Sequence, residues 1–501
     1  MLKNSTGDTN VEVQDSSTSP NHDKLIKNSI KFLIAVLAAI AIMIIPSTSF
    51  GMTGLTVVEH RVIAIFIFAA LMWLLEAVPA WTTSVLVVVL LLLTTSNSCL
   101  WFQDKSSSAE LFGTLVSYKK YMITFADPII MLFLGGFVLA IGTTKTGLDV
   151  KMARIMLKPF GKKSNYVLLG FILVTAIFSM FISNTATAAM MLAFLAPVLK
   201  ALPDDGKGKI ALVMAIPIGA NLGGIGTPIG TPPNAFVLKY LNDPAGLNMG
   251  IGFAEWFVHM FPFVILMLFI AWFMLRKFFP FKQKEIILNL KGETKKGKDT
   301  WIVGITFIIT VILWMLDSLT GVNANVVAMI PIAIFSVTGV LTKDDLAKIN
   351  WSVLWMVAGG FALGVALEET GLAQLLVTSI PFGNWPVMLV LIGSGLICWT
   401  LSTFISNTAT AALMVPVIAA VGVGMGSTLG PIGGVKTLLV CIAISASLAM
   451  ALPISTPPNA LAHSTGLVQQ KYMEKTGITL GVIGFIIGFT VIIGYSVVGL
   501  W

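Results

Sequence analysis

A short polar tripeptide occurs twice in the apolar part of this 501-residue chain, and its side chains could bind an ion. Ser-Asn-Thr occupies positions 183–185 and again 406–408, each time followed by Ala-Thr-Ala-Ala. About fifty residues after each copy comes Thr-Pro-Pro-Asn-Ala, at 231–235 and 456–460. Hydroxyl and amide groups can bind ions without carrying a charge. No HExxH motif, P-loop or nucleophile arrangement accompanies them, so the motifs favour binding over catalysis and we do not expect an enzyme.

The same residues predict helix ends. Ser and Thr are strong N-cap residues, and Pro favours the first helical position. Each Ser-Asn-Thr therefore predicts a hairpin tip between two helices, and each Thr-Pro predicts a break inside a helix. Four helix N-termini would then converge, and their free N–H groups favour an anion. Carbonyls at the ends of the preceding helices, with Ser and Asn oxygens, suit Na⁺. Small polar residues can also simply pack helices together, but the duplication favours a binding site.

The composition places these motifs in a membrane. Hydrophobic residues make up 56% of the chain and charged residues 11%, whereas a soluble domain has about 25% charged residues. Continuous apolar stretches predict an all-α polytopic membrane protein with about eleven transmembrane helices and two re-entrant hairpins, and not a β-barrel. The spanning segments are predicted at 30–46, 57–77, 81–94, 127–143, 210–240, 255–275, 299–318, 324–341, 351–368, 433–464 and 479–499. The hairpins are predicted at 166–200 and 386–423, with a kinked spanning helix as the alternative for each.

The chain also repeats itself. Four motifs recur in the same order at offsets of 223 to 225 residues, which predicts two copies of one structural unit. We divide the chain into a disordered cytoplasmic tail, a first transmembrane helix, and repeats 1 and 2, at 1–28, 29–50, 51–280 and 281–501. Broken helices are predicted at about 210–240 and 433–464. Each repeat contains an odd number of crossings, so the second is inverted relative to the first, as in many secondary transporters.

Basic residues predict the orientation. Lys and Arg are frequent in 143–165 and 276–298 and absent from 369–432. The positive-inside rule then places the N-terminus in the cytoplasm and the C-terminus outside, in the plasma (inner) membrane. The first hairpin would enter from the cytoplasm and the second from outside. The loop at 95–126 is predicted outside although it carries three lysines.

At these motifs the chain resembles the divalent anion:sodium symporter family, which contains Na⁺-coupled cotransporters and exchangers of di- and tricarboxylates. The resemblance covers nearly the whole chain after the tail. It implies a homodimer in which a transport domain carrying both hairpins moves like an elevator against a fixed scaffold domain. The substrate-binding residues expected from the motifs and the resemblance are Ser183, Asn184, Thr185, Thr231, Pro232, Ser406, Asn407, Thr408, Thr456 and Pro457. The resemblance implies one Na⁺ site at Ser179, Ser183, Asn184 and Gly230, and a second at Ser402, Ile405, Asn407 and Ser455.

Some positions depart from the cotransporter pattern. Ile405 and Ser455 stand where alanines are usual, and His463 stands where an aromatic or small residue is expected, which leaves room for an exchanger. Lys239 and His463 follow the two Thr-Pro pairs closely and could compensate the charge of a substrate. Snorkelling or helix packing is the alternative role for both.

Energetics requires coupling. Importing a dianion against 100 mV costs about 4.6 kcal/mol, at roughly 2.3 kcal/mol per charge. Either two or more Na⁺ enter with the anion, or one dianion exchanges for another. The sequence and the resemblance therefore predict a secondary transporter of C4–C5 dicarboxylates such as succinate, malate, fumarate or 2-oxoglutarate. We expect no cofactor beyond Na⁺ as a possible coupling ion, and no nucleic-acid partner. A carrier for another divalent anion such as sulfate, or an ion channel, remains an alternative.

Overall fold

The computed structural model describes residues 19–100, 112–202, 207–243, 246–286 and 297–501. Helices and short loops make up these ranges, and the β-pairing within them consists of two isolated bridges. Ten of the described helices are long and apolar enough to cross a membrane. The predicted all-α polytopic membrane protein is therefore confirmed.

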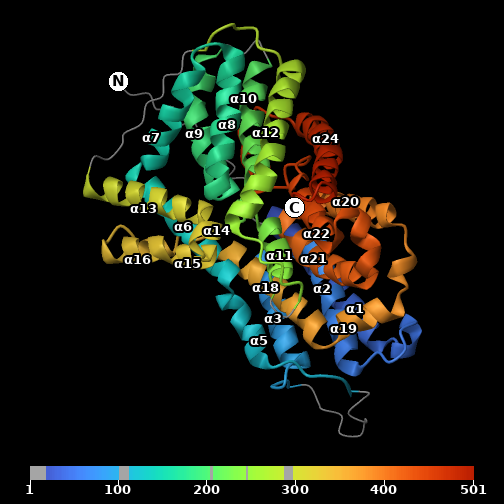
Figure 1. Cartoon of the computed structure of the whole chain (residues 1–501). Helices are drawn as coiled ribbons and strands as arrows, with labels where there is room; N and C mark the ends of the chain where they lie inside the picture. The colour runs from blue at the N-terminus through green and yellow to red at the C-terminus, as the bar shows by residue number, and fades with distance from the viewer. Residues whose placement is uncertain (1–18, 101–111, 203–206, 244–245, 287–296) are drawn as a thin grey trace, which may run out of the picture.

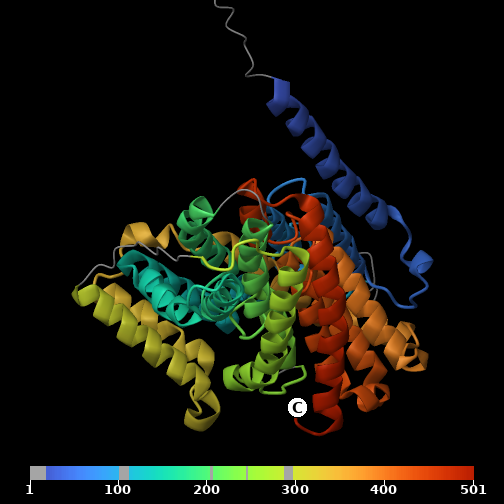
Figure 2. The same cartoon turned by 90° about the horizontal axis from the view of Figure 1, so that it is seen from above.

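The helices of the first half coincide with the predicted segments. In chain order they are α1 (Ser19–Ile44), α2 (Val57–Leu75), α3 (Ala80–Thr95), α5 (Tyr118–Ile123), α6 (Pro128–Thr146), α7 (Leu148–Leu157), α8 (Ser164–Phe181), α9 (Asn184–Ala201), α10 (Gly208–Gly224), α11 (Pro232–Leu241) and α12 (Phe253–Phe278). Figure 2 shows α1 projecting from the rest of the molecule. Few of its apolar side chains from Leu25 to Ile44 are buried, as expected for a lipid-facing helix.

The second half follows the same plan. Its helices are α13 (Lys298–Met315), α14 (Asp317–Thr320), α15 (Ala324–Val327), α16 (Met329–Val337), α17 (Lys343–Leu346), α18 (Trp351–Glu369), α19 (Leu372–Ser379), α20 (Val387–Phe404), α21 (Asn407–Met425), α22 (Gly434–Ser447), α23 (Pro457–Ser464) and α24 (Gln470–Val497). The pairs α8/α9 and α20/α21 form the two hairpins, and α10/α11 and α22/α23 form the two broken helices.

Helix lengths place the breaks deep in the molecule. At 1.5 Å per residue, the 10-residue helix α11 is about 15 Å long, half of a hydrocarbon core of about 30 Å. The 18-residue helix α8 is about 27 Å long, which exceeds the roughly 15 Å of a half-membrane helix. The break after α10 therefore lies about half a membrane away from the far end of α11.

Glycines let the first hairpin approach its broken helix closely. Figure 1 shows α8, α9, α10 and α12 side by side. A Cβ atom added at Gly219 would lie 2.7 Å from the carbonyl oxygen of Ile172, and one added at Gly223 would lie 2.5 Å from Cα of Ala176. Any larger residue at these two positions would push α10 away from α8.

The two repeats interlock at the breaks. Helix α9 of the first hairpin packs against α23, and α21 of the second hairpin packs against α11. Each hairpin therefore lies beside the short helix of the other repeat. Each helix that begins at a hairpin tip is thus in contact with a helix that begins at a Thr-Pro pair of the other repeat.

Hydrogen bonds between loops agree with the predicted sidedness. The N–H of Ser164 donates to Lys284 at 3.0 Å and that of Ile286 donates to Lys162 at 2.7 Å, which joins the two lysine-rich segments. Lys120, in the loop that the charge rule placed outside, pairs with Glu369, also expected outside. A lysine in an outside loop is unexpected under the positive-inside rule. Because Glu369 balances its charge, Lys120 is weaker evidence against the predicted topology. The absolute orientation stays a prediction.

A buried carboxylate ties two loops together on the lysine-rich face. Asp345 in α17 accepts hydrogen bonds from Nζ of Lys145 at 2.5 Å and Nζ of Lys348 at 2.8 Å. The side chain of Thr342 adds a third donor at 2.7 Å. These donors, Lys145 foremost, hold the pKa of Asp345 well below its usual range.

The lowered pKa predicts a stability that depends on pH. A carboxylate with a depressed folded-state pKa stabilises the fold above its ordinary pKa of about 3.9, and this contribution fades as the pH falls toward the folded-state value. We expect Asp345→Asn to lose about 1–3 kcal/mol at pH 7, because Lys145 loses its charged partner. Thermal unfolding in detergent should show a constant deficit between about pH 5 and 8 that shrinks as the pH falls below about 4.

The adjacent exposed Asp344 offers a matched control. Asp344→Asn should unfold like the wild type at every pH. Equal unfolding temperatures for the two variants at pH 7 would contradict the structural role of Asp345.

Candidate binding site at the helix breaks

The two hairpin tips are capped as the sequence predicts. Oγ of Ser183 accepts a hydrogen bond from the N–H of Ala186, and Oγ of Ser406 accepts one from the N–H of Ala409, both at 3.3 Å. Each serine thereby satisfies one free donor at the start of α9 or α21. Within the described residues, no acceptor is found for the N–H groups of the next residues at each tip, Asn184 and Thr185 or Asn407 and Thr408.

Three oxygens crowd together behind the first tip. Oγ of Ser179 lies 2.5 Å from Oδ1 of Asn184 and 2.8 Å from the carbonyl oxygen of Ala220. A hydroxyl group has one hydrogen, so it can serve only one of these acceptors fully at a time. Gly230 lies against this cluster, since a Cβ at Gly224 would be 2.8 Å from Oδ1 of Asn184 and 2.9 Å from the carbonyl oxygen of Gly230. Such a set of neutral oxygens suits a cation.

The second repeat builds the same cluster. Oγ of Ser402 lies 2.8 Å from both Oδ1 of Asn407 and the carbonyl oxygen of Ala446. Two other residues expected at this cation site have protein partners. The N–H of Ile405 donates to Leu401, and Oγ of Ser455 donates to the carbonyl oxygen of Thr403 at 2.6 Å.

The asparagine of each Thr-Pro-Pro-Asn motif holds its own break together. Nδ2 of Asn234 lies 3.0 Å from the carbonyl oxygen of Gly224 and 2.8 Å from that of Thr227. Nδ2 of Asn459 donates to the carbonyl oxygens of Met450 and Leu452 at 2.8 and 3.0 Å. Several carbonyls that the sequence suggested as free cation ligands are therefore hydrogen-bonded already.

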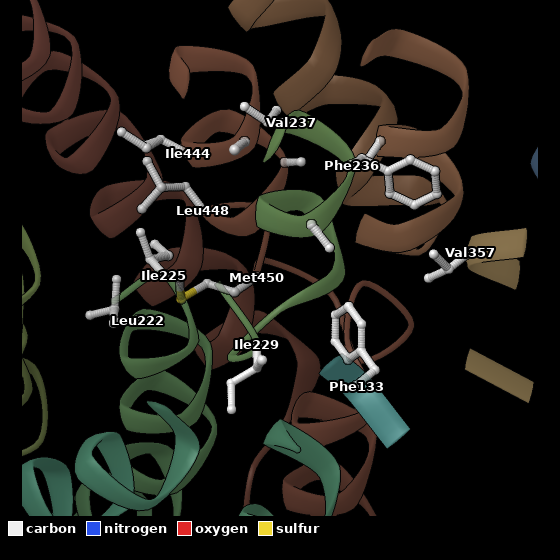
Figure 3. Close-up of a cluster of buried hydrophobic side chains, with 14 of the residues drawn as sticks. Phe133, Leu222, Ile225, Ile229, Phe236, Val237, Val357, Ile444, Leu448 and Met450 are labelled. Carbon is white, nitrogen blue, oxygen red and sulfur yellow. The ribbon is translucent and has the colours of Figure 1, made fainter. Parts of the chain in front are cut away.

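Apolar side chains surround these polar breaks. Figure 3 shows that they come from both repeats and include Phe133, Leu222, Ile225, Ile229, Phe236, Val237, Val357, Ile444, Leu448 and Met450. Backbone groups enclosed in this way must find partners inside the protein or face an aqueous cavity. The two asparagines meet this requirement, a role that sequence reasoning did not assign to them although they belong to the quoted motif.

The Thr-Pro pairs begin the short helices as predicted. Thr231 and Thr456 are the buried N-cap residues of α11 and α23, and a proline follows each at the first helical position. Oγ1 of Thr456 accepts from the N–H of Asn459 at 3.3 Å, whereas the side chain of Thr231 makes no capping bond. Among the other tip residues, Thr408 is buried and Thr185 is half-buried.

The two basic candidates lie in the last turns of the two short helices, α11 and α23. Nζ of Lys239 pairs with Oδ2 of Asp127, the N-cap residue of α6, at 2.9 Å. His463 is exposed near the end of α23. The charge of Lys239 is therefore already matched by a carboxylate of the protein.

Deep helix breaks duplicated in two interlocked repeats define this protein as a secondary transporter. A family model described as citrate transporter (CitMHS) matches residues 70–435. The chain is 31% identical over 482 residues to an uncharacterized transporter of Haemophilus influenzae, covering 91% of this chain and 95% of that protein. It is 29% identical over 463 residues to the sodium-dependent dicarboxylate transporter SdcS of Staphylococcus saprophyticus, covering 85% and 84%.

Two further comparisons bear on length and fold. The chain is 30% identical over 449 residues to an uncharacterized transporter of Schizosaccharomyces pombe, but it spans only 49% of that protein. The fold resembles MtrF of Neisseria gonorrhoeae, with a TM-score of 0.53 at 13% identity over 82% of this chain and 94% of that one. It also resembles the YdaH transporter of Alcanivorax borkumensis, with a TM-score of 0.53 at 12% identity over 77% and 88%. These two likenesses concern the fold alone.

The chain belongs to the citrate transporter (CitMHS) family, and its resemblance to the divalent anion:sodium symporter family is confirmed. It is a multi-pass membrane transporter.

Proposed function

We propose that this protein carries C4–C5 dicarboxylates across the plasma membrane, and that the two hairpin tips and the two Thr-Pro pairs bind the substrate. The observation that carries the proposal is the interlocking of the repeats, since α9 lies beside α23 and α11 beside α21. Each half of the site then combines a tip from one repeat with a helix start from the other. Two anion-binding halves, each built from both repeats, fit a molecule with two carboxylates.

Helix N-termini provide the anion recognition in this proposal. The first-turn N–H groups carry partial positive charge and donate to carboxylate oxygens. Lys239 contributes little net charge because Asp127 neutralises it. Recognition of a dianion therefore rests on backbone donors, on hydroxyl groups and on any cations bound beside the tips.

The oxygen clusters support cations as co-substrates. Each cluster places a serine, an asparagine and a carbonyl oxygen together without a net charge. Sodium dependence in the name of the SdcS relative supports Na⁺ as the ion. In the second repeat, the hydroxyl of Ser455 already donates to the carbonyl oxygen of Thr403. If the second cluster therefore binds no Na⁺, exchange of dicarboxylates is the alternative to symport.

An elevator movement would divide the chain into two units. We assign the hairpins, the broken helices and α12 and α24 to the moving unit, and α2, α3, α6, α13, α16 and α18 to the scaffold. The ion pair between Lys239 on α11 and Asp127 at the start of α6 would then link the two units. We also propose that two copies associate through their scaffolds, and the mass of the purified protein in detergent tests this.

Uptake into proteoliposomes tests the function. Labelled succinate should accumulate when an inward Na⁺ gradient is imposed, and a K⁺ gradient of the same size should not drive it. Uptake that needs internal dicarboxylate and ignores Na⁺ would replace symport with exchange. Uptake of labelled sulfate by a protein that does not take up labelled succinate would reject the dicarboxylate assignment, and flux without counterflow would indicate a channel.

A further inference from the structure

Asn221 connects the two repeats at the breaks. This residue is 2% exposed and lies on α10 just before the first break. Its Nδ2 donates to Oγ1 of Thr456 at 3.1 Å and to Oδ1 of Asn459 at 3.2 Å. Both partners stand at the start of α23 in the other repeat.

The surrounding network dictates the orientation of both amide groups. Nδ2 of Asn459 faces the carbonyl oxygens of Met450 and Leu452, which can only accept. Oδ1 of Asn459 must therefore face Asn221. Because that oxygen is an acceptor, Asn221 has to present its NH₂ group to Asn459 and hence also to Thr456.

The hydroxyl group of Thr456 can make only one further hydrogen bond, and only as a donor. Its Oγ1 accepts from Nδ2 of Asn221 and from the N–H of Asn459, so both of its lone pairs are engaged. The hydroxyl hydrogen has no acceptor among the hydrogen bonds of the described residues. The Thr456 hydroxyl can therefore act toward a ligand only as a donor, and a carboxylate oxygen is its natural partner.

In the part of the chain that the structure describes, the other Thr-Pro pair, at Thr231, has no equivalent of the contact between Asn221 and Thr456. Ala220 and Ala446 accept equivalent bonds from Ser179 and Ser402, so the residue that corresponds to Asn221 is Ser447. Oγ of Ser447 is buried and has no hydrogen-bond partner among the described residues. The hydroxyl of Thr231 makes no capping bond, so within the described part of the chain it can donate to a ligand or accept from one.

We propose that Asn221 is a positioning residue that makes the two halves of the substrate site unequal. It turns the Thr456 half into a fixed donor that takes a carboxylate, while the Thr231 half takes either a carboxylate or a neutral polar group. This inference rests on the proposed function. It implies that a half-amide of succinate binds with its carboxylate at Thr456 and its amide at Thr231.

Substitutions of Asn221 test the inference through KM for succinate. Asn221→Asp keeps the shape but replaces the donor with an acceptor, so the Thr456 hydroxyl turns toward position 221. We expect KM to rise about tenfold or more, because a hydrogen bond to a charged group is lost, with a smaller change in kcat. Asn221→Ala removes the donor without adding an acceptor, so the Thr456 hydroxyl loses its fixed orientation but is not turned toward position 221. KM should therefore rise less than in Asn221→Asp.

A double-mutant cycle separates positioning from a general structural role. If Asn221 acts through the Thr456 hydroxyl, Asn221→Ala should raise KM no further in a Thr456→Val background. Additive effects would overturn the proposal, as would an unchanged KM in both folded variants, Asn221→Asp and Asn221→Ala. Ser447→Ala, the matched control, should stay within about twofold of the wild type because it removes no hydrogen bond.

Binding and transport by the wild-type protein distinguish a failure of the positioning role from a failure of the proposed function. Wild-type protein that neither binds nor transports succinate rejects the dicarboxylate assignment itself. Wild-type transport with unchanged KM in both Asn221 variants rejects only the positioning role.

Discussion

Replacing Asn184 or Asn407 with alanine should reduce succinate uptake at least about 100-fold, while the protein still reaches the membrane folded. Each substitution removes the amide oxygen beside Ser179 or Ser402 and deletes a polar side chain at the start of α9 or α21. Two lost interactions with charged partners, at about 1.5–3 kcal/mol each, account for a loss of this size. Ser183 and Ser406 keep their capping bonds, so the tips should still form.

The hairpin itself supplies the control for this experiment. Asn165 is exposed at the other end of α8, so Asn165→Ala makes the same chemical change about 27 Å from the tip. It should transport like the wild type. Initial rates in proteoliposomes, with thermal unfolding as the check on folding, give the comparison. Wild-type uptake by both tip variants would refute the assignment of the tips to the site.

Gly230→Ala should disable the first break by a backbone clash. A Cβ at this position would lie 2.4 Å from the carbonyl oxygen of Gly224 and 2.8 Å from its Cα. Backbone cannot move aside as a flexible side chain can, and overpacking of this kind costs about 1–3 kcal/mol or more. Since Gly224 also lies against Asn184, the strain should reach the first tip. We expect uptake to fall at least about tenfold, because each 1.4 kcal/mol is worth a factor of ten.

Gly393 in α20 is the matched control for this glycine. A Cβ there meets nothing within 4 Å, so Gly393→Ala should retain both uptake and unfolding temperature. A Gly230→Ala protein with wild-type uptake would show that the first break tolerates a different backbone, which contradicts a role for its exact geometry.

The helices and their N-caps could be predicted from the sequence because both depend on residues that are near one another in the chain. Apolar length predicts a spanning helix, and Ser183 and Ser406 cap the next helix through a bond to a residue three positions away. The duplication of two motifs, at offsets of 223 and 225 residues, predicted both hairpins and both breaks, and the helices begin at these motifs. The family resemblance rested on the same motifs.

The partners of the polar groups were beyond the reach of the sequence. Spacing suggested that Lys239 could compensate the charge of a substrate, and only the structure shows its ion pair with Asp127 at the start of α6. Carbonyls at the breaks looked free because the rule for helix ends is local, and the folded break returns the amide of Asn234 onto them.

What the sequence by itself determined is the set of elements: apolar helices of given lengths, two capped tips, two Thr-Pro breaks and an inverted duplication. What only the tertiary structure decided is how the two copies join. Asn221 and Thr456 are hydrogen-bonded across 235 positions of the chain, and no local propensity specifies a contact of that range. It exists because close packing seats α10 against α23, where the buried NH₂ group of Asn221 finds its acceptors on Thr456 and Asn459.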